Sequence, residues 1–269
     1  MVELLSTEIY AENRRSSKGN QLKWQRNNRW YKADYTGYEG LSEYMVSQLL
    51  AFSNLRKEEY VLYWTEKIRY KEQFFKGCGS ENFIPDGWQL LTLERLFQQQ
   101  FGESLYQSVF RISGITERLQ YLVSQTERMT ELGGFGEYLT KLLTVDAFFL
   151  NEDRHTHNIA VLMDPHGRYH LCPLFDQGAS LLSDTTMDYP MSGELYNLIY
   201  SVKAKTVSTD FMEALEAAEV LYGQQLDFHF SRSTILKLLE KETCYPPEIK
   251  ERVCQILLKQ SRKYRYLFK

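Results

Sequence analysis

The sequence predicts an α+β fold with two lobes: a small mixed lobe with an antiparallel sheet and one helix, and a larger helical lobe. The first observation is a change of hydrophobic period near residues 91–94, with strands and one helix before it and helices after it. The second is a single hairpin pattern that interrupts the helices. The third is size, because 269 residues with 43% hydrophobic side chains can fill the cores of two lobes. We therefore expect lobes over residues 1–92 and 93–269.

The predicted small lobe is built from strands and one helix. Residues 21–26 and 29–33 alternate partly between apolar and polar side chains and flank Asn27-Asn28, a pair typical of a hairpin turn. Apolar side chains at helical spacing over residues 41–52 predict an amphipathic helix. Two short apolar runs over residues 78–93, separated by a Pro-Asp-Gly turn, predict two further strands.

The predicted helical lobe contains one hairpin. A helix stops at Gly133-Gly134, and a strongly apolar helix follows over residues 135–149. Two strands, 158–163 and 168–175, then flank a turn with Asp, Pro and Gly at the positions that a type I turn favours. The remaining helices are predicted over residues 209–222, 231–242 and 247–266.

Composition argues against several classes of function. A formal net charge of −3 gives no overall positive field, so specific nucleic-acid binding is disfavoured. A basic tail is interpreted as the solvated face of the last helix, with a local basic patch left open: Lys259, Arg262, Lys263, Arg265 and Lys269. No signal peptide or membrane-spanning run is visible, and four cysteines without paired spacing are typical of reduced, mostly buried thiols. We therefore expect a cytoplasmic protein, with secretion without a cleaved signal left open.

The most informative stretch lies around the predicted hairpin. Asp153 and Asn158 lie five positions apart on the loop before it, and Asp176 follows its second strand. A tight hairpin brings the chain back to where it began, so we expect Asp176 to lie close to Asn158. Phosphoryl transfer from ATP uses a carboxylate that orients the attacking hydroxyl, and an amide and a carboxylate that hold Mg²⁺. The predicted cofactors are therefore ATP and Mg²⁺, with Asn158 and Asp176 as metal ligands and Asp153 as the catalytic carboxylate.

This pattern resembles the HipA-like kinases. The resemblance rests on the Asn-x-Asp-x-His-x-x-Asn pattern from Asn151 to Asn158, followed by an apolar strand and Asp176, and it covers about residues 28–180. The family comprises bacterial serine/threonine kinases with a bilobal, protein-kinase-like fold. The resemblance therefore implies a kinase that acts on a protein substrate, with autophosphorylation and a regulatory partner protein as further expectations. It also implies that His155 fixes the conformation of the loop by hydrogen bonding.

Two residues of the small lobe complete the resemblance. Lys32, near the end of the second strand, matches the strand lysine that contacts the α- and β-phosphates. A carboxylate from the following helix normally holds such a lysine, and Glu39 and Glu43 both lie on one face of that helix. We favour Glu43, because Glu39 lies in the first turn, where an acidic side chain complements the helix dipole.

The nucleotide-covering segments are less distinctive. No G-x-G-x-x-G loop is present, and only the stretch with Ser16, Ser17 and Gly19 can cover the phosphates. The resemblance implies a serine-containing loop there, whose serines are autophosphorylated in some members. We expect adenine to meet backbone groups near Leu91 and Leu93. Because the chain begins close to the kinase core, we do not expect the extra N-terminal subdomain of the larger toxin members.

Other functions stay open at this point. Asp153, His155 and His157 could form the metal site of a hydrolase, although zinc needs at least three well-placed ligands. The poor glycine loop is compatible with a nucleotide-binding regulator that has little turnover. A kinase-like enzyme could also act on a lipid or small molecule, or transfer AMP to a protein.

Overall fold

The computed structural model describes residues 1–8 and 21–269, which divide into two units that we describe separately. Unit 1 comprises Met1–Phe83, Phe175–Val202 and Asp227–Lys269, apart from the undescribed residues. Unit 2 comprises Ile84–Leu174 and Lys203–Leu226. These units group segments by their packing, so the lobe boundary expected after residue 92 stays a prediction.

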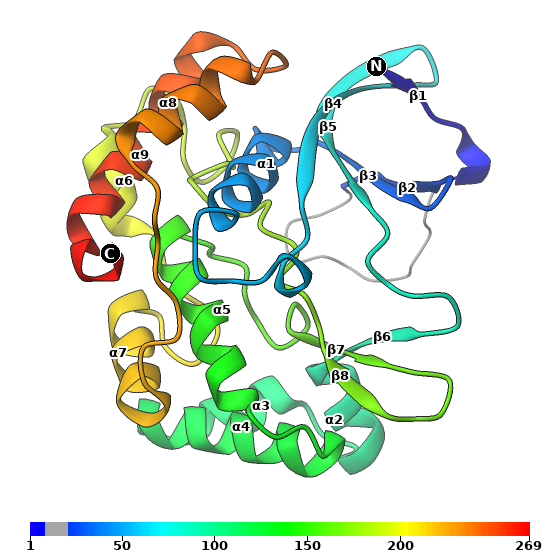
Figure 1. Cartoon of the computed structure of the whole chain (residues 1–269), viewed down its shortest axis with the longest axis vertical. Coiled ribbons are helices and arrows are strands. Elements are labelled where there is room, and N and C mark those ends of the chain that lie inside the picture. Colours follow the sequence, from blue (N-terminus) through cyan, green and yellow to red (C-terminus); the bar gives the residue numbers. More distant parts are fainter. Residues whose placement is uncertain (9–20) are drawn as a thin grey trace. The chain divides into compact units, whose positions relative to one another are not determined.

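A curled five-stranded sheet forms one part of unit 1 (Figure 1). Its strands are β1 (Val2–Glu3), β2 (Lys23–Arg26), β3 (Arg29–Ala33), β4 (Tyr63–Tyr70) and β5 (Gln73–Glu81). Their order across the sheet is β1-β4-β5-β3-β2. All neighbours are antiparallel except the two-residue β1, which pairs with β4 in parallel. The expected antiparallel sheet is therefore present, with one short parallel strand added at its edge.

Two hairpin turns of the same kind carry different sequence signals. Asn27 and Asn28 join β2 to β3 with φ values of 50° and 59°, as their sequence predicts. Lys71 and Glu72 join β4 to β5 with φ values of 48° and 63°. Lysine and glutamate rarely take this left-handed conformation, so the sequence carries no turn signal there. This is why β4 and the first half of β5 are absent from the predicted elements.

The alternation of side chains in β3 divides its residues between two environments. Tyr31 and Ala33 are buried in a cluster with Trp24, Ile68 and other apolar side chains. Successive side chains of a strand point to opposite faces, so the residue between them, Lys32, points to the face that α1 covers. Strand geometry thus turns a lysine inward in an otherwise apolar strand.

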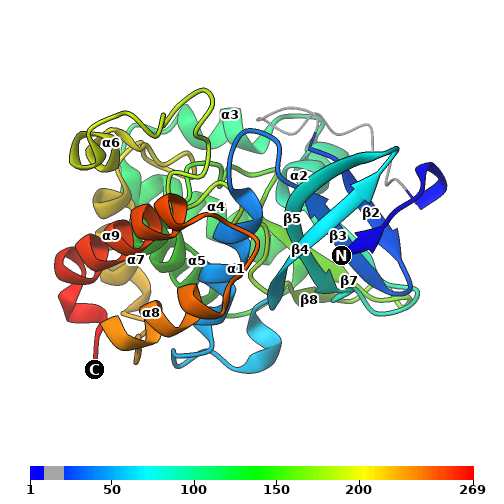
Figure 2. The same cartoon turned by 90° about the horizontal axis from the view of Figure 1, so that it is seen from above.

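Helix α1 (Glu39–Leu50) packs against β4 and β5 (Figures 1 and 2). The helix and the sheet approach closely at two glycines, because a Cβ atom added to Gly40 would lie 2.4 Å from the carbonyl carbon of Gly77. The Gly40 amide donates to Asp34 Oδ1 at 2.7 Å, which satisfies one of the free donors at the start of the helix. Residues that precede α1 therefore fix where it begins on the sheet.

Three further helices belong to unit 1: α6 (Leu195–Ser201), α8 (Arg232–Lys241) and α9 (Pro247–Lys263). Helix α8 packs against α1 and α9, and α6 packs against α9 (Figure 2). The predictions for α8 and α9 are confirmed, and α9 begins at Pro247 as the sequence indicates. It ends three residues before the predicted position and is followed by a short 3₁₀ turn, while the seven-residue α6 was not predicted.

Unit 2 contains helices and a three-stranded antiparallel sheet, in the order β6-β7-β8. Its elements are β6 (Gln89–Thr92), α2 (Leu93–Phe101), α3 (Leu105–Phe110), α4 (Ile115–Thr130), α5 (Phe135–Phe149), β7 (Ala160–Met163), β8 (Tyr169–Leu171) and α7 (Phe211–Tyr222). Helix α5 packs against α4 and α7 (Figure 1). The predicted hairpin is confirmed as β7 and β8, with both strands shorter than expected.

Helix α5 is buried along nearly its whole length, as its apolar sequence predicts. Its polar threonines fit because Thr140 and Thr144 donate hydrogen bonds to backbone carbonyls one turn earlier, at 2.9 and 2.8 Å. The helix ends at Leu150, which takes a left-handed conformation with φ of 60°. This turn directs the chain into the loop that holds Asp153.

Two further features concern the cysteines and the apolar character of the helices. All four cysteines are free thiols, and Cys78, Cys172 and Cys254 are buried, as expected. Across residues 1–8 and 21–269, no helix has the length and apolar character needed to cross a membrane.

Candidate functional site

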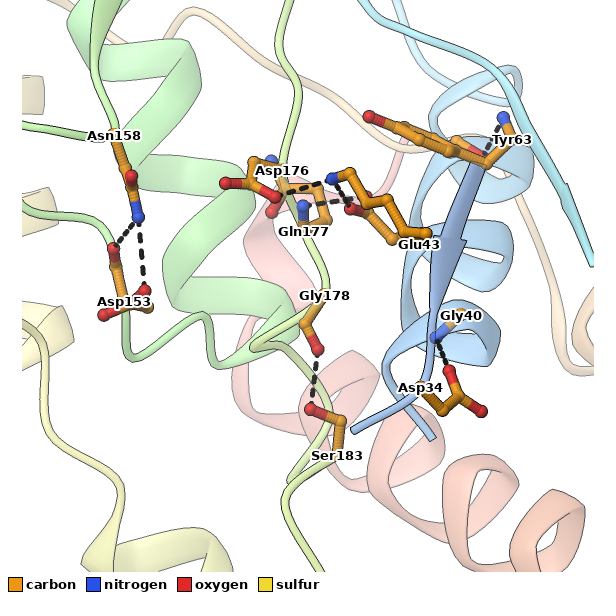
Figure 3. Close-up of polar contacts among 12 residues, drawn as sticks. Asp34, Gly40, Glu43, Tyr63, Asp153, Asn158, Asp176, Gln177, Gly178 and Ser183 are labelled. Atoms are coloured by element: carbon orange, nitrogen blue, oxygen red, sulfur yellow. Dashed lines mark hydrogen bonds and ion pairs between the residues drawn. The ribbon is translucent and has the colours of Figure 1, made fainter. Parts of the chain in front are cut away.

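Three residues that are distant in sequence form an ion cluster in unit 1, which we call the lysine cluster: Lys32, Glu43 and Asp176 (Figure 3). Lys32 Nζ lies 2.5 Å from Glu43 Oε1 and 2.6 Å from Asp176 Oδ1. The side chain of Lys32 is 12% exposed and that of Glu43 is 1% exposed, whereas that of Asp176 is 27% exposed. The cluster therefore presents one partly exposed carboxylate above a buried ion pair.

The two candidate partners of Lys32 have different contacts. Glu43 binds Lys32, as the sequence favours. Glu39 instead accepts hydrogen bonds from the backbone amides of Tyr35, Thr36 and Gly37, the nearest at 2.7 Å. Its carboxylate therefore binds the loop that precedes α1, in place of a conventional helix cap.

Burial and charge act against each other on Lys32. Burial lowers the pKa of the ammonium, but Asp176 and Glu43 together raise it by more, so its pKa lies well above the ordinary value. The ammonium also lies 5.3 Å from the centre of the Tyr63 ring. Lys32 is therefore a fixed positive charge at neutral pH, held by two carboxylates.

The segment after Asp176 forms a hydrogen bond to the lysine cluster. The Gln177 amide donates to Glu43 Oε2 at 2.8 Å, so both oxygens of that buried carboxylate have partners. Asp176 itself has a positive φ of 60°, an uncommon conformation for a residue other than glycine. Further along, Ser183 Oγ donates to Gly178 O at 2.6 Å (Figure 3). Sequence reasoning did not find the role of Gln177, because a backbone donor leaves no signal in residue identity.

In unit 2, the loop over residues 151–158 is held together by its own polar groups. The Asp153 amide donates to Asn151 Oδ1 at 3.2 Å. Asn158 Nδ2 donates to the backbone oxygen of Asp153 at 2.8 Å and to its Oδ2 at 3.2 Å (Figure 3). Since the amide nitrogen of Asn158 is used in this way, the predicted role of metal ligand would fall to its amide oxygen. Asp153 and Asn158 thus lie on one loop, as predicted, and the hydrogen bonds between them are an addition to that prediction.

A buried ion pair beneath this loop was not predicted. Arg154 Nε lies 3.0 Å from Asp146 Oδ2, and both side chains are almost fully buried. Arg154 also donates to the backbone oxygen of Asn158 at 2.8 Å, and Asn151 donates to Asp146 Oδ1 at 3.0 Å. Asp146 therefore holds Asn151 directly and, through Arg154, the backbone of Asn158. The available signal was an acidic residue inside a strongly apolar helix, since such a residue is rarely buried without a partner.

His155 lies beside Asp153, the predicted catalytic carboxylate. The His157 amide donates to His155 Nδ1 at 3.2 Å, so the neutral ring carries its proton on Nε2, which lies 3.6 Å from Asp153 Oδ1. Burial is the largest cause that lowers the pKa of His155, and the nearby positive groups lower it further while Asp153 opposes them. The ring is therefore neutral at physiological pH. Within the described residues, no group of three or more His, Cys, Asp or Glu is arranged to hold a metal.

The backbone near Leu91 and Leu93, which was predicted to contact adenine, forms hydrogen bonds within the protein. The Leu93 amide donates to Ile159 O at 2.8 Å, so it is not available to adenine. Leu91 lies in β6, paired with Val161 of β7. A role for this stretch in adenine binding stays a prediction. The other expected nucleotide-binding residues, Ser16, Ser17 and Gly19, lie outside the described residues.

The lysine cluster and the 151–158 loop belong to different units. Their internal geometry is described above, and the expected closeness of Asp176 to Asn158 stays a prediction. Each group supplies part of the predicted chemistry: a buried lysine held by carboxylates in one, and an aspartate with an asparagine in the other.

Comparison with known proteins identifies the fold. No protein-family model and no curated protein sequence matches this chain. The structure is similar to the Helicobacter pylori proinflammatory kinase CtkA, with a TM-score of 0.61 and 14% sequence identity, over 97% of this chain and 94% of that one. It is also similar to HipA of Shewanella oneidensis MR-1, solved with HipB and operator DNA, with a TM-score of 0.42 and 13% identity, over 94% of this chain and 66% of that one. The chain therefore has a mixed α+β, kinase-like fold, as the sequence predicts.

Proposed function

We propose that this protein is a Mg²⁺- and ATP-dependent serine/threonine protein kinase of the HipA-like type. The observation that carries the proposal is the lysine cluster, a buried ammonium held between Glu43 and Asp176 in a chain with a kinase-like fold. A positively charged strand lysine paired with a helix glutamate is the arrangement that kinases use to hold the phosphates of ATP. Burying such a charge between two carboxylates is costly for stability alone, which favours a functional reason for it.

The donor atoms suit Mg²⁺ bound to a nucleotide. Mg²⁺ prefers oxygen ligands and commonly uses one or two protein groups together with phosphate oxygens. The amide oxygen of Asn158 and the partly exposed carboxylate of Asp176 are ligands of this kind. When bound, the metal would neutralise charge on the β- and γ-phosphates. We propose that these two residues are the protein ligands of Mg²⁺.

The proposed reaction is transfer of the γ-phosphoryl group to a hydroxyl. The hydroxyl oxygen forms a bond to the γ-phosphorus, the bond from that phosphorus to the β–γ bridging oxygen breaks, and ADP leaves with the electron pair. Asp153 orients the hydroxyl and takes its proton. Asn158 Nδ2, which donates to Asp153 Oδ2 at 3.2 Å, and the neutral His155 hold the carboxylate in position. Arg154 and Asp146, whose side chains are almost fully buried, position this loop.

Intact mass spectrometry after incubation with Mg²⁺ and ATP tests the proposal, with wild type beside Asp153→Asn. We expect wild type to gain about 80 Da per phosphate, and the variant to gain none. Peptide mapping then examines Ser16 and Ser17 as acceptors. Because an enzyme can lack a site for modifying itself, release of ADP in the presence of a protein mixture is measured in parallel.

The outcomes separate the proposed kinase from the other functions. A gain of about 329 Da would show AMP transfer by the same fold instead of phosphorylation. Binding of Mg²⁺–ATP without ADP release or mass change would favour a nucleotide-binding regulator. Absence of Mg²⁺–ATP binding in a thermal-shift assay would contradict every nucleotide-dependent function.

A further inference from the structure

A short segment of unit 2 is fastened to the 151–158 loop although it lies far away in sequence. Thr206 Oγ1 donates to the backbone oxygen of Arg154 at 2.6 Å, and Thr206 is buried. Arg118 donates to the backbone oxygen of Val207 at 2.9 Å, which holds the segment from its other side. The backbone at Lys205, directly before Thr206, is therefore fixed against the loop that carries the catalytic aspartate.

The side chain of Lys205 reaches that aspartate. Its Nζ lies 3.6 Å from Asp153 Oδ1, the same oxygen that His155 Nε2 approaches. The side chain of Lys205 is 41% exposed, whereas that of Asp153 is 13% exposed. A loose pair with one exposed partner adds little to stability, so stability alone is a weak reason for this contact.

The contact also bears on the proposed reaction. While the ammonium rests on Asp153 Oδ1, it occupies one of the two carboxylate oxygens that could meet the substrate hydroxyl. That oxygen becomes accessible if the ammonium moves to a phosphoryl oxygen, where negative charge develops during transfer. The long, flexible and partly exposed side chain of Lys205 permits such a move from a fixed backbone.

We propose that Lys205 is a second catalytic lysine, which contacts the phosphoryl group during its transfer and rests on Asp153 beforehand. This inference depends on the proposed kinase function. The bonds that form and break are those given above, with the hydroxyl proton passing to Asp153 and ADP leaving with the electron pair. Lys205 supplies positive charge to the equatorial oxygens of the group in transfer, where charge is spread in the transition state.

Substitutions in the full-length protein test this role. Lys205→Met removes the charge and is expected to lower kcat about 100-fold, with little change in KM for ATP. Lys205→Arg keeps the charge and is expected to recover activity to within about tenfold of wild type. Lys203→Met is the matched control, since Lys203 is an exposed lysine on the same segment, two positions earlier. The control is expected to have wild-type activity.

A binding measurement gives a readout that does not depend on turnover. Titration calorimetry compares Mg²⁺–ADP alone with Mg²⁺–ADP plus aluminium fluoride, which mimics the phosphoryl group in transfer. Lys205→Met is expected to bind Mg²⁺–ADP as wild type does, and to lose about tenfold or more of the added affinity that aluminium fluoride confers. Lys203→Met is expected to retain that added affinity.

The outcomes distinguish this inference from the function on which it rests. If wild type transfers phosphate and Lys205→Met does so at the same rate, the inference is wrong and the kinase function stands. If Lys205→Met and Lys205→Arg lose activity equally together with thermal stability, Lys205 has a structural role and the inference is again wrong. If wild type binds no Mg²⁺–ATP or releases no ADP, the proposed function fails and the role of Lys205 fails with it.

Discussion

The lysine cluster and the 151–158 loop, the two parts of the candidate site, are built in opposite ways. The lysine cluster joins Lys32, Glu43 and Asp176, which come from a strand, a helix and a loop up to 144 residues apart. In the 151–158 loop, the hydrogen bonds that place Asp153 and Asn158 span only two to five residues. The first group depends on tertiary packing, and the second is mostly local.

This difference matches the two tasks of the proposed kinase. A lysine fixed by two carboxylates in a buried cluster is suited to holding a ligand of fixed charge, such as the phosphates of a nucleotide. An aspartate on a local loop, beside a neutral histidine and an exposed lysine, can change its partners during a reaction. We therefore expect substitutions in the lysine cluster to weaken nucleotide binding and substitutions in the loop to slow transfer.

The largest expected effect is on the rate of phosphoryl transfer. Asp153→Asn should lower kcat about 10²- to 10⁴-fold while Mg²⁺–ATP affinity stays unchanged, because the amide cannot accept the hydroxyl proton. Asp176→Ala should instead weaken Mg²⁺–ATP binding about tenfold or more, through loss of a metal ligand and a partner of Lys32. Single-turnover kinetics and titration calorimetry measure the two quantities, with melting temperatures as a check on folding. An equal loss of ATP affinity in both variants would contradict the division of tasks.

The next effect concerns the support of the 151–158 loop. Arg154→Met leaves Asp146 buried without its cation, and we expect a loss of about 3–5 kcal/mol in the free energy of unfolding. Adding Asp146→Leu should recover much of this loss, because no charge is then left unpaired. Urea denaturation of both single variants and the double variant gives the coupling. A double variant as unstable as the sum of the two single variants would show that the pair does not act as a unit.

A smaller effect is expected at the support of the lysine cluster. Glu43→Gln keeps the shape of the side chain and removes its charge, so Lys32 is held by one carboxylate instead of two. We expect the Kd for Mg²⁺–ATP to rise about tenfold, the equivalent of one charged hydrogen bond. Glu39→Gln is the control, since Glu39 lies one turn away and binds the preceding loop. A similar loss of affinity in both variants would point to general damage to α1 and not to Lys32.

The same contrast explains what the sequence could predict. The local arrangement of Asp153 and Asn158 follows from their spacing, and Glu43 could be preferred over Glu39 from its position in the helix. The partnership of Arg154 with Asp146 depends on how α5 meets the loop, which the spacing alone does not reveal. Most elements were predicted from hydrophobic period and turn signals. Two of the exceptions are β4 and α6, which lack such signals because the turn after β4 uses Lys71 and Glu72 and α6 is only seven residues long.

The two units also contain partly buried titratable groups with opposite pKa shifts, and the one in unit 1 is Asp34. Asp34 follows Lys32 by two residues, and its two oxygens accept hydrogen bonds from the Gly40 amide and the Tyr245 hydroxyl, both at 2.7 Å. Burial, and then the nearby Glu39, raise the pKa of this carboxyl to about 7. His155 in unit 2 is shifted in the other direction, with a lowered pKa. Asp34 should therefore disfavour the folded state as pH rises, and His155 should disfavour it as pH falls.

The smallest expected effect follows from Asp34. Its pKa when folded is above the value of about 3.9 in the unfolded chain, so between about pH 4 and pH 7 the folded state binds more protons and stability falls as pH rises. Asp34→Asn removes this dependence, and its amide can still accept from Gly40 and donate to the Tyr245 oxygen. When the pH is raised from about 4 to about 8, we expect the free energy of unfolding of the variant to increase by about 1 kcal/mol relative to that of wild type. This is less than the full pKa shift implies, because the side chain of Asp34 is partly exposed. Urea denaturation at both pH values measures this difference, in which the other titrating groups cancel. If the difference in free energy of unfolding between variant and wild type is constant across this range, Asp34 is ionised throughout. The carboxylate that joins the strand of Lys32 to the start of the helix of Glu43 would then keep its charge at every pH tested.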